Sequence, residues 1–227
     1  MTYPKTTRST LKRIADRGLY DKETVHAVLD AGMIAHVGIA PEGQPFVIPV
    51  LYARMGEEII FHGAKASRLL KVVQAGGEVC VTVTLLDGLV LARSLFEHSM
   101  NYRSVVVFGK GRLIEDRDEK MEALRLISEQ MLPGRWDDAR QPNEKELNAT
   151  TVVAVTIEEA TAKIRTGGPE DNEEDYALPV WAGELPFRTG AGEPVPDGRM
   201  EDHIQLPAYI RTQISQMNAD KEKHSSV

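Results

Sequence analysis

The chain has 227 residues, of which 42% are hydrophobic and 27% charged, a composition typical of a globular domain with a buried core. Its formal net charge of −7 argues against a general nucleic-acid binder, because such proteins carry a basic surface. The single cysteine, Cys80, permits no intramolecular disulfide. The first residues lack the apolar core of a signal peptide, and no stretch has the ~20 apolar residues of a membrane span. We therefore expect a cytoplasmic protein with neither a nucleic-acid nor a membrane partner.

The N-terminal third is predicted to contain a basic arm, one helix and three strands. Residues 1–19 carry five Lys or Arg side chains, and Asp21 is a helix N-cap before a short apolar stripe that stops at Gly32. Runs of β-forming residues at 33–40, 45–54 and 58–64 are bounded by Gly or Pro, which indicates antiparallel hairpins.

The remainder alternates strands with fewer helices. We expect helices at 67–75, 118–132 and 207–217, one helical turn at 144–147, and strands at 78–86, 104–116, 150–157 and 162–168. In the strand at 78–86, the odd-numbered valines should face one side, and Cys80, Thr82 and Thr84 the other. The segment 218–227 is predicted to be a disordered tail.

This pattern predicts a mostly β fold with peripheral helices. Six or more short strands with few helices between them indicate an antiparallel sheet, and a sheet of that size removes its exposed edges by closing into a barrel. We divide the chain into an N-terminal basic arm at 1–19, a barrel domain at 20–187, and a C-terminal extension at 188–227 with a short helix and a flexible tail.

The stretch FHGAKASRLLK, residues 61–71, is the strongest candidate for a binding site. A strand runs through a tight turn into a helix start, where unpaired amides favour an anion. Lys65, Ser67, Arg68 and Lys71 surround this point, so a phosphate would meet amides, a hydroxyl and cations. The alternative is a solvated basic face on an amphipathic helix.

Other segments offer weaker signals. PFVIPVLY, residues 45–52, is either an ordinary edge strand or one that borders a planar ligand, and Pro49 marks an edge or a bulge. His62 and His98 are the candidate catalytic groups, whereas His36 in an apolar strand is expected to be buried. No pair of histidines has metal-ligand spacing and there is no cysteine cluster, so we expect no metal site.

A polar run precedes the apolar strand at 104–116. It carries Arg93, His98, Asn101, and the consecutive residues Tyr102, Arg103 and Ser104. Buried polar groups without partners cost about 1–3 kcal/mol each, so these side chains should bond a ligand or a second chain.

The ordered set GQPFVIPVLYAR, FHGAKASRLLK, VCVTVTLLDG, NYRSVVVFGKGRLIED and DYALPVWAGELP resembles the pyridoxamine 5'-phosphate oxidase-like, FMN-binding split-barrel superfamily, in particular its nitroimidazole-resistance-like branch. The resemblance implies a homodimer of six-stranded antiparallel split barrels with two FMN sites at the interface. It implies that Ser67 and Arg68 bind the phosphate, helped by Lys65 and Lys71. The residues it implies around the flavin ring are Val47, Ile48, Pro49, Val50, Leu51, His62 and Gly63, with Tyr102, Arg103, Ser104 and Trp181 at the interface and Ser104 and Trp181 reaching the site from the partner.

The sequence also departs from the oxidases. Their C-terminal signature contains several arginines that bind substrate phosphate, whereas this chain has LPVWAGELPFR, and Leu69 stands where the oxidases have a second basic residue after the Ser-Arg pair. Pyridoxamine phosphate is therefore not the expected substrate.

Three functions stay open from the sequence. The first is an FMN-dependent oxidoreductase acting on a small molecule, with Arg103 or a backbone amide facing the flavin and His62 or His98 as proton donor. The second is a non-catalytic flavin or haem binder, with His36, His62 or His98 as the haem's axial ligand. The third is a regulatory or protein-interaction domain, which the acidic stretch and the C-terminal extension would suit.

Overall fold

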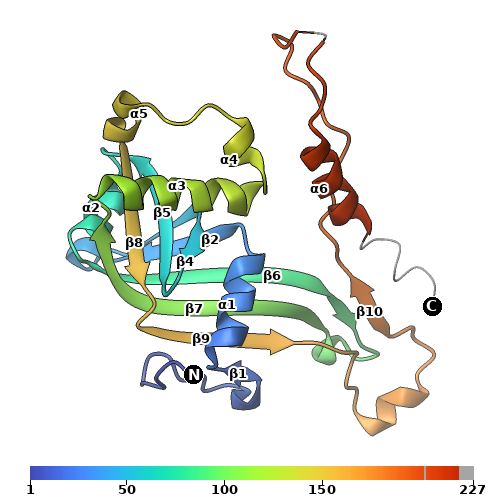
Figure 1. Cartoon of the computed structure of the whole chain (residues 1–227). Coiled ribbons are helices and arrows are strands. Elements are labelled where there is room, and N and C mark those ends of the chain that lie inside the picture. Colours follow the sequence, from blue (N-terminus) through green and yellow to red (C-terminus); the bar gives the residue numbers. More distant parts are fainter. Residues whose placement is uncertain (202, 220–227) are drawn as a thin grey trace.

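The computed structural model describes residues 1–201 and 203–219 (Figure 1). Its helices are α1 (Lys22–Ala31), α2 (Arg68–Gln74), α3 (Arg117–Met131), α4 (Arg135–Asp138), α5 (Glu144–Ala149) and α6 (Ala208–Ala219). Its strands are β1 (Gly18–Leu19), β2 (Ile34–Ile39), β3 (Phe46–Leu51), β4 (Ala53–Met55), β5 (Glu58–Ala64), β6 (Glu78–Leu91), β7 (Ser99–Leu113), β8 (Thr150–Thr156), β9 (Glu159–Arg165) and β10 (Gly183–Pro186). The predicted tail at 218–227 lies largely outside the described residues.

The strands form one curled antiparallel sheet in the order β3-β2-β6-β7-β8-β5-β4. The long strand β7 pairs with β6 on one edge, and on its other edge with β9 over residues 102–108 and then with β8 over residues 111–113. The same edge of β7 thus pairs with both β9 and β8, and the sheet divides at the point where one strand follows the other. The predicted fold, a mostly β split barrel with peripheral helices, is confirmed, although short strands such as β1, β4 and β10 raise the count in the described residues to ten.

Local sequence signals explain where several elements begin and end. The Asp21 carboxylate accepts a hydrogen bond from the Thr24 amide at 2.8 Å, which caps α1 as predicted. Asp116 caps α3 in the same way through the amides of Asp118 and Glu119. The alternation in β6 is also confirmed, because Val79, Val81 and Val83 are buried.

Two glycines let the elements around α2 pack closely. A side chain at Gly111 of β7 would collide with the Val73 carbonyl of α2, and one at Gly109 would collide with the Thr156 carbonyl at the end of β8. Only a residue without a Cβ allows this approach. Gly111 therefore lets α2 pack against β7, and Gly109 lets β7 approach the end of β8.

The interior has two cores. The larger lies between the sheet, α1 and α2, and its bulky buried side chains include Leu29, Tyr52, Phe61 and Val81. The smaller lies beneath α3, where Ile127 packs with residues of β5 and β8. Tyr3 also packs into the larger core, so the start of the N-terminal arm lies against the barrel.

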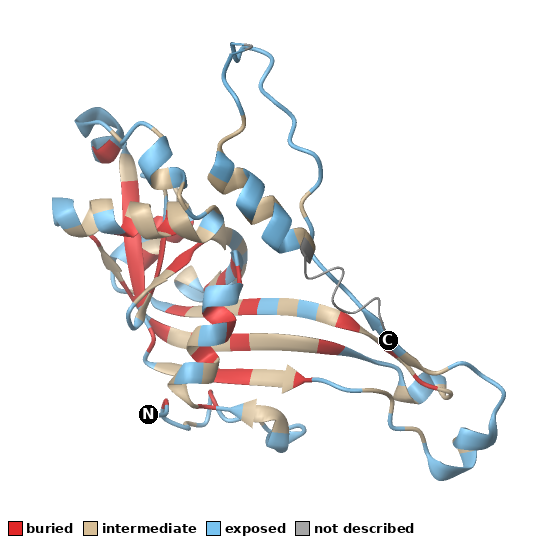
Figure 2. Cartoon of the chain, turned by 45° about the vertical axis from the view of Figure 1, so that its right-hand side comes forward, coloured by how far each residue is buried: buried red, intermediate tan, exposed pale blue. Residues whose placement is uncertain are grey.

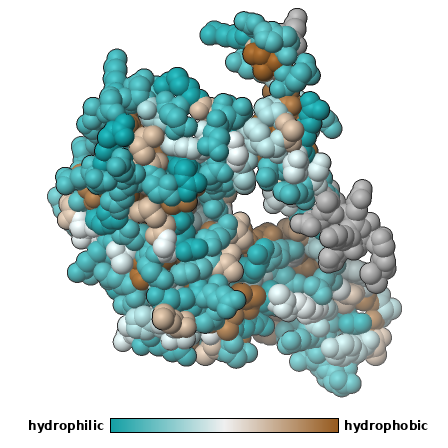
Figure 3. Space-filling view, viewed as in Figure 1, coloured by the Kyte–Doolittle hydropathy of each residue, from teal (hydrophilic) through white to brown (hydrophobic). Residues whose placement is uncertain are grey.

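The far end of the β6–β7 pair extends beyond both cores (Figure 1). We call residues 86–102 and 166–187 the distal end. Figure 2 shows exposed residues throughout the C-terminal extension that follows β10, and the space-filling view leaves an opening between this extension and the barrel (Figure 3). Within the described chain, no helix combines the length and apolar character needed to cross a bilayer.

Candidate functional site

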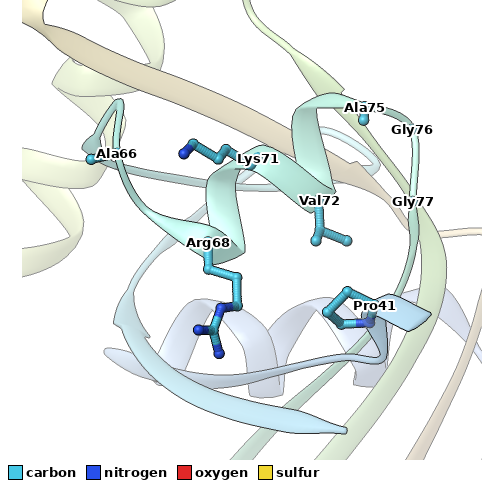
Figure 4. A pocket seen from close by; sticks show the side chains of 8 residues that line it. All are labelled: Pro41, Ala66, Arg68, Lys71, Val72, Ala75, Gly76 and Gly77. Carbon is cyan, nitrogen blue, oxygen red and sulfur yellow. The ribbon is translucent and has the colours of Figure 1, made fainter. Parts of the chain in front are cut away.

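A pocket of about 710 Å³ opens beside α2, and we call it the Arg68 pocket (Figure 4). Ala66 and α2 form one wall, and Pro41, from the turn before β3, faces Val72 from the opposite side. The lining residues are Pro41, Ala66, Arg68, Lys71, Val72, Ala75, Gly76 and Gly77. The volume lies within the range of cofactor pockets.

Two cations of this pocket have no acidic partner. Among the described residues, neither Arg68 nor Lys71 forms an ion pair. The Arg68 guanidinium instead lies over the ring of Phe46, the first residue of β3, 4.4 Å from its centroid. Uncompensated cations on a concave surface favour an anionic ligand, and the contact with Phe46 holds Arg68 toward the strand that was predicted to border a planar ring.

Ser67 fixes the start of α2. Its Oγ accepts a hydrogen bond from the Leu70 amide at 3.5 Å, which makes it the N-cap of a seven-residue helix. The hydroxyl proton remains available to an acceptor. Lys65, in contrast, lines a second, smaller pocket on another face of α2. The structure therefore brings Arg68 and Lys71 together and separates Lys65 from them.

The strand predicted to border a ring lies at the edge of the sheet. β3 is the terminal strand of the order, as Pro49 indicated, and it pairs only with β2, from Ile39↔Phe46 to Ile34↔Leu51. Val47 and Pro49 point away from the core, and Val47 is 68% exposed, whereas Ile48 and Val50 pack against the larger core. One face and one edge of β3 are therefore open to a ligand.

The three histidines lie in different surroundings. Crowded protein atoms lower the pKa of His62 through desolvation, although its side chain reaches the surface. His98 is exposed, and its Nδ1 lies 2.9 Å from the Ser94 carbonyl. The prediction that His36 is buried is wrong: it pairs with Thr82 and Pro49 on the outward face of the sheet, because its neighbours Ala35 and Val37 take the inward positions.

The predicted interface residues do not reach the Arg68 pocket within one chain. Tyr102, Arg103 and Ser104 lie on β7, and Trp181 lies two residues before β10, a strand at the opposite end of the sheet from α2 (Figure 1). Trp181 is 67% exposed. These residues can join the pocket only through a second chain.

The strand predicted at 104–116 begins earlier, at Ser99, so Asn101 to Ser104 of the polar run lie within β7, and the run is largely bonded inside the chain. Arg103 donates to Asp87 through Nε at 3.0 Å and Nη2 at 2.7 Å, and the Ser104 hydroxyl donates to the Lys163 carbonyl. Asn101 is buried between Arg165 and Glu184. The inference that these groups need an external partner is therefore wrong for Asn101 and Arg103, because segments far along the sequence satisfy them.

Arg93 is an exception. Its Nη1 donates to Asp171 at 3.1 Å and its guanidinium stacks on Tyr176, but its Nε is buried with no acceptor in the described part of the chain. Sequence reasoning also missed Phe46 and the Gly76–Gly77 wall of the Arg68 pocket. These paired glycines directly follow the helix predicted at 67–75 and were a visible signal that the sequence interpretation did not use.

Comparison with known proteins gives a consistent picture. The chain matches the family model described as pyridoxamine 5'-phosphate oxidase over residues 21–164. It is 42% identical to the flavocytochrome Anf3 from Azotobacter vinelandii, covering 91% of this chain and 96% of that one with a TM-score of 0.85. It is 33% identical to a FAD and haem binding protein from Mycobacterium smegmatis, covering 87% and 97% with a TM-score of 0.83.

A candidate 5-nitroimidazole antibiotic resistance protein from Bacteroides thetaiotaomicron is more distant. It is 24% identical, covers 65% of this chain and 86% of that one, and has a TM-score of 0.55, so it supports the fold alone. No curated protein sequence matches the chain significantly.

Proposed function

Because the chain belongs to the pyridoxamine 5'-phosphate oxidase family, we propose that it is a flavoprotein whose cofactor phosphate lies in the Arg68 pocket. The observation that carries the proposal is the match to two cofactor-binding relatives over about nine-tenths of the chain, 91% and 87%. The unpaired Arg68 and Lys71 suit a phosphate, and Ser67 offers a hydroxyl beside them. The open face and edge of β3, from Val47 to Leu51, suit the flavin ring.

The identity of the flavin is a separate question. The family resemblance implies FMN, whereas the relative from Mycobacterium smegmatis binds FAD. The Arg68 pocket continues from Arg68 to the backbone of Gly76 and Gly77, which offers room beyond one phosphate. We therefore favour FAD over FMN for this chain.

Haem is proposed as a second cofactor, because both of these relatives are haem proteins by description, one a flavocytochrome and the other a FAD and haem binder. An axial histidine must present a bare ring nitrogen. His98 has the needed tautomer if its Nδ1–H donates to Ser94, which leaves Nε2 free. His62 stays neutral near pH 7 because its pKa is lowered, and His36 faces outward from the sheet. All three remain ligand candidates.

A bound flavin would supply hydride and one-electron transfer, so we propose an oxidoreductase with a small-molecule substrate. The protein's part is to hold the cofactor and manage protons. Since desolvation lowers the pKa of His62, this imidazole is better suited to accept a proton than to donate one at neutral pH. Arg103 is bound to Asp87 and is less available to the flavin than the sequence implied.

A homodimer is part of the proposal. Large apolar side chains are exposed at the distal end, with Leu95 and Phe96 each 86% exposed, and the buried Nε of Arg93 lacks an acceptor. A second copy of the chain would cover these apolar side chains and could supply a hydrogen-bond acceptor to the Arg93 Nε. It would also bring Tyr102, Ser104 and Trp181 to the Arg68 pocket of its partner. We further propose that the protein acts in the cytoplasm.

Absorption spectra of the purified protein test the cofactors, followed by chromatography of the flavin released on boiling. We expect flavin bands with released FAD, together with a Soret band. Released FMN would replace FAD in the proposal, and a colourless protein that takes up neither added flavin nor haem would contradict it.

Variants H36A, H62A and H98A identify the haem ligand by their spectra. The ligand's replacement should abolish the Soret band and retain the flavin bands, and the other two variants serve as matched controls. If all three retain an unaltered Soret band, none of these histidines binds the haem iron.

A further inference from the structure

A second pocket lies between α2, the start of α3 and the junction of α5 with β8. Its volume is about 340 Å³, and we call it the Lys65 pocket. None of its lining residues also lines the Arg68 pocket. The lining residues are Lys65, Gln74, Leu113, Ile114, Glu115, Lys120, Asn148, Thr150 and Thr151.

Two lysines line this pocket, and neither forms an ion pair within the described residues. Lys120 Nζ donates to the Leu147 carbonyl at 2.7 Å and the Thr150 carbonyl at 2.6 Å, so neutral oxygens hold it and its charge remains. Lys65 has no ion pair among the described residues. Lys65 and Lys120 line the same pocket, and burial and then the nearby charge of Lys65 lower the pKa of Lys120.

The rest of the lining is polar and only weakly engaged. Seven of the nine lining side chains are polar or charged, which distinguishes this pocket from a defect in apolar packing. The Glu115 carboxylate and the amides of Gln74 and Asn148 have no hydrogen-bond partner among the described side chains. They offer both donors and acceptors next to the two cations.

We propose that the Lys65 pocket binds a small organic phosphate that carries hydroxyl groups. The phosphoryl group would take the free N–H bonds of Lys65 and Lys120, since ammonium groups bind phosphate as point charges. Glu115 would accept hydrogen bonds from the hydroxyls, and Gln74 and Asn148 can bond them in either direction. Inorganic phosphate would contact only Lys65 and Lys120, and a neutral sugar would contact only Glu115, Gln74 and Asn148.

The test is isothermal titration calorimetry of the flavin- and haem-saturated protein with ribose 5-phosphate, inorganic phosphate and ribose. We expect ribose 5-phosphate to bind more tightly than either fragment. K65Q should weaken that binding about tenfold or more, because one charge-assisted contact is lost. E115Q should weaken it less and should leave the binding of inorganic phosphate unchanged.

K22Q is the control, because Lys22 lines neither pocket and pairs with Glu57. Unchanged ribose 5-phosphate binding in K65Q, or an equal loss in K22Q, would overturn the proposal, as would equal affinity for inorganic phosphate.

The flavin content of K65Q separates this proposal from the flavin site. If Lys65 held the cofactor phosphate, as the sequence pattern implied, K65Q would lose flavin. The proposal requires K65Q to retain flavin and lose ribose 5-phosphate.

Discussion

The two ends of the β6–β7 pair differ in whether their cationic side chains have acidic partners. We call the end beside α2 the barrel end, in contrast to the distal end. Around α2, Lys65, Arg68 and Lys71 have no acidic partner. At the distal end, Arg93 pairs with Asp171, and Arg165, the last residue of β9, is buried in bonds to Asn101 and two glycine carbonyls of that end. The unpaired cations around α2, beside the larger core, indicate ligand sites. At the distal end, which has little hydrophobic core, the paired charges indicate that hydrogen bonds take the place of hydrophobic packing.

This comparison predicts that the distal end depends on its polar network. Arg165→Ala would leave the Asn101 side chain and the carbonyls of Gly167 and Gly168 without a donor. We expect the free energy of unfolding to fall by about 4 kcal/mol, since each unsatisfied buried group costs about 1–3 kcal/mol. Urea denaturation measures it.

The control for this variant is Arg117→Ala, whose side chain is 60% exposed and paired with Glu144 at the surface. It should lower the free energy of unfolding much less than Arg165→Ala, because water screens an exposed ion pair. Equal losses in both variants would show that the distal network contributes no more than a surface ion pair.

The exposed apolar side chains at the distal end predict a second copy of the chain. Replacing Leu95 and Phe96 together by Asp should convert a dimer to a monomer at micromolar concentration, because burying each side chain is worth about 1.5–3 kcal/mol. Light scattering after size-exclusion chromatography gives the mass. Val195→Asp is the control, since Val195 is 90% exposed in the C-terminal extension; a monomeric wild-type protein would refute the interface.

The barrel end is tested by Arg68→Ala. We expect flavin affinity to fall about thirtyfold, equivalent to about 2 kcal/mol for one charge-assisted contact. Fluorescence titration of apoprotein measures the affinity. Lys22→Ala should bind flavin like the wild type, because Lys22 pairs with Glu57 at 2.9 Å away from the pocket; matching affinities for the two variants would remove Arg68 from the site.

The smallest expected effect concerns pH. Because the pKa of His62 is lowered in the folded protein, the unfolded chain binds more protons between the two pKa values. The contribution of the His62 side chain to the free energy of unfolding is therefore complete above its pKa in the unfolded chain, about 6.5. It is lost as the pH falls through the lower pKa of the folded protein. His62→Gln should reduce the slope of unfolding free energy against pH in this window. Burial also lowers the pKa of His26, which is present in both proteins and cancels in the comparison. An unaltered slope would mean that His62 is not desolvated.

The candidate site was only partly visible in the sequence. The residue types at 65–71 indicated an anion site, and the Arg68 pocket agrees with that pattern for Arg68 and Lys71. The turn before α2 sends Lys65 to another pocket, and spacing along the chain cannot show this. Phe46 was missed because its contact with Arg68 joins two elements that are separated by β4 and β5.

The sequence by itself determined the approximate positions of most strands and helices, the cap at Asp21, the two faces of β6 and the edge position of Pro49, because each depends on neighbours within a few residues. Only the tertiary structure decided which charges are neutralised. Asp87, Asp171 and Glu184 bond to Arg103, Arg93 and Asn101 from other segments of the chain, while no acid of the described residues pairs with Arg68 or Lys65. Charge pairing depends on distances of a few ångströms between segments far apart in the chain, so it appears only once the sheet has curled.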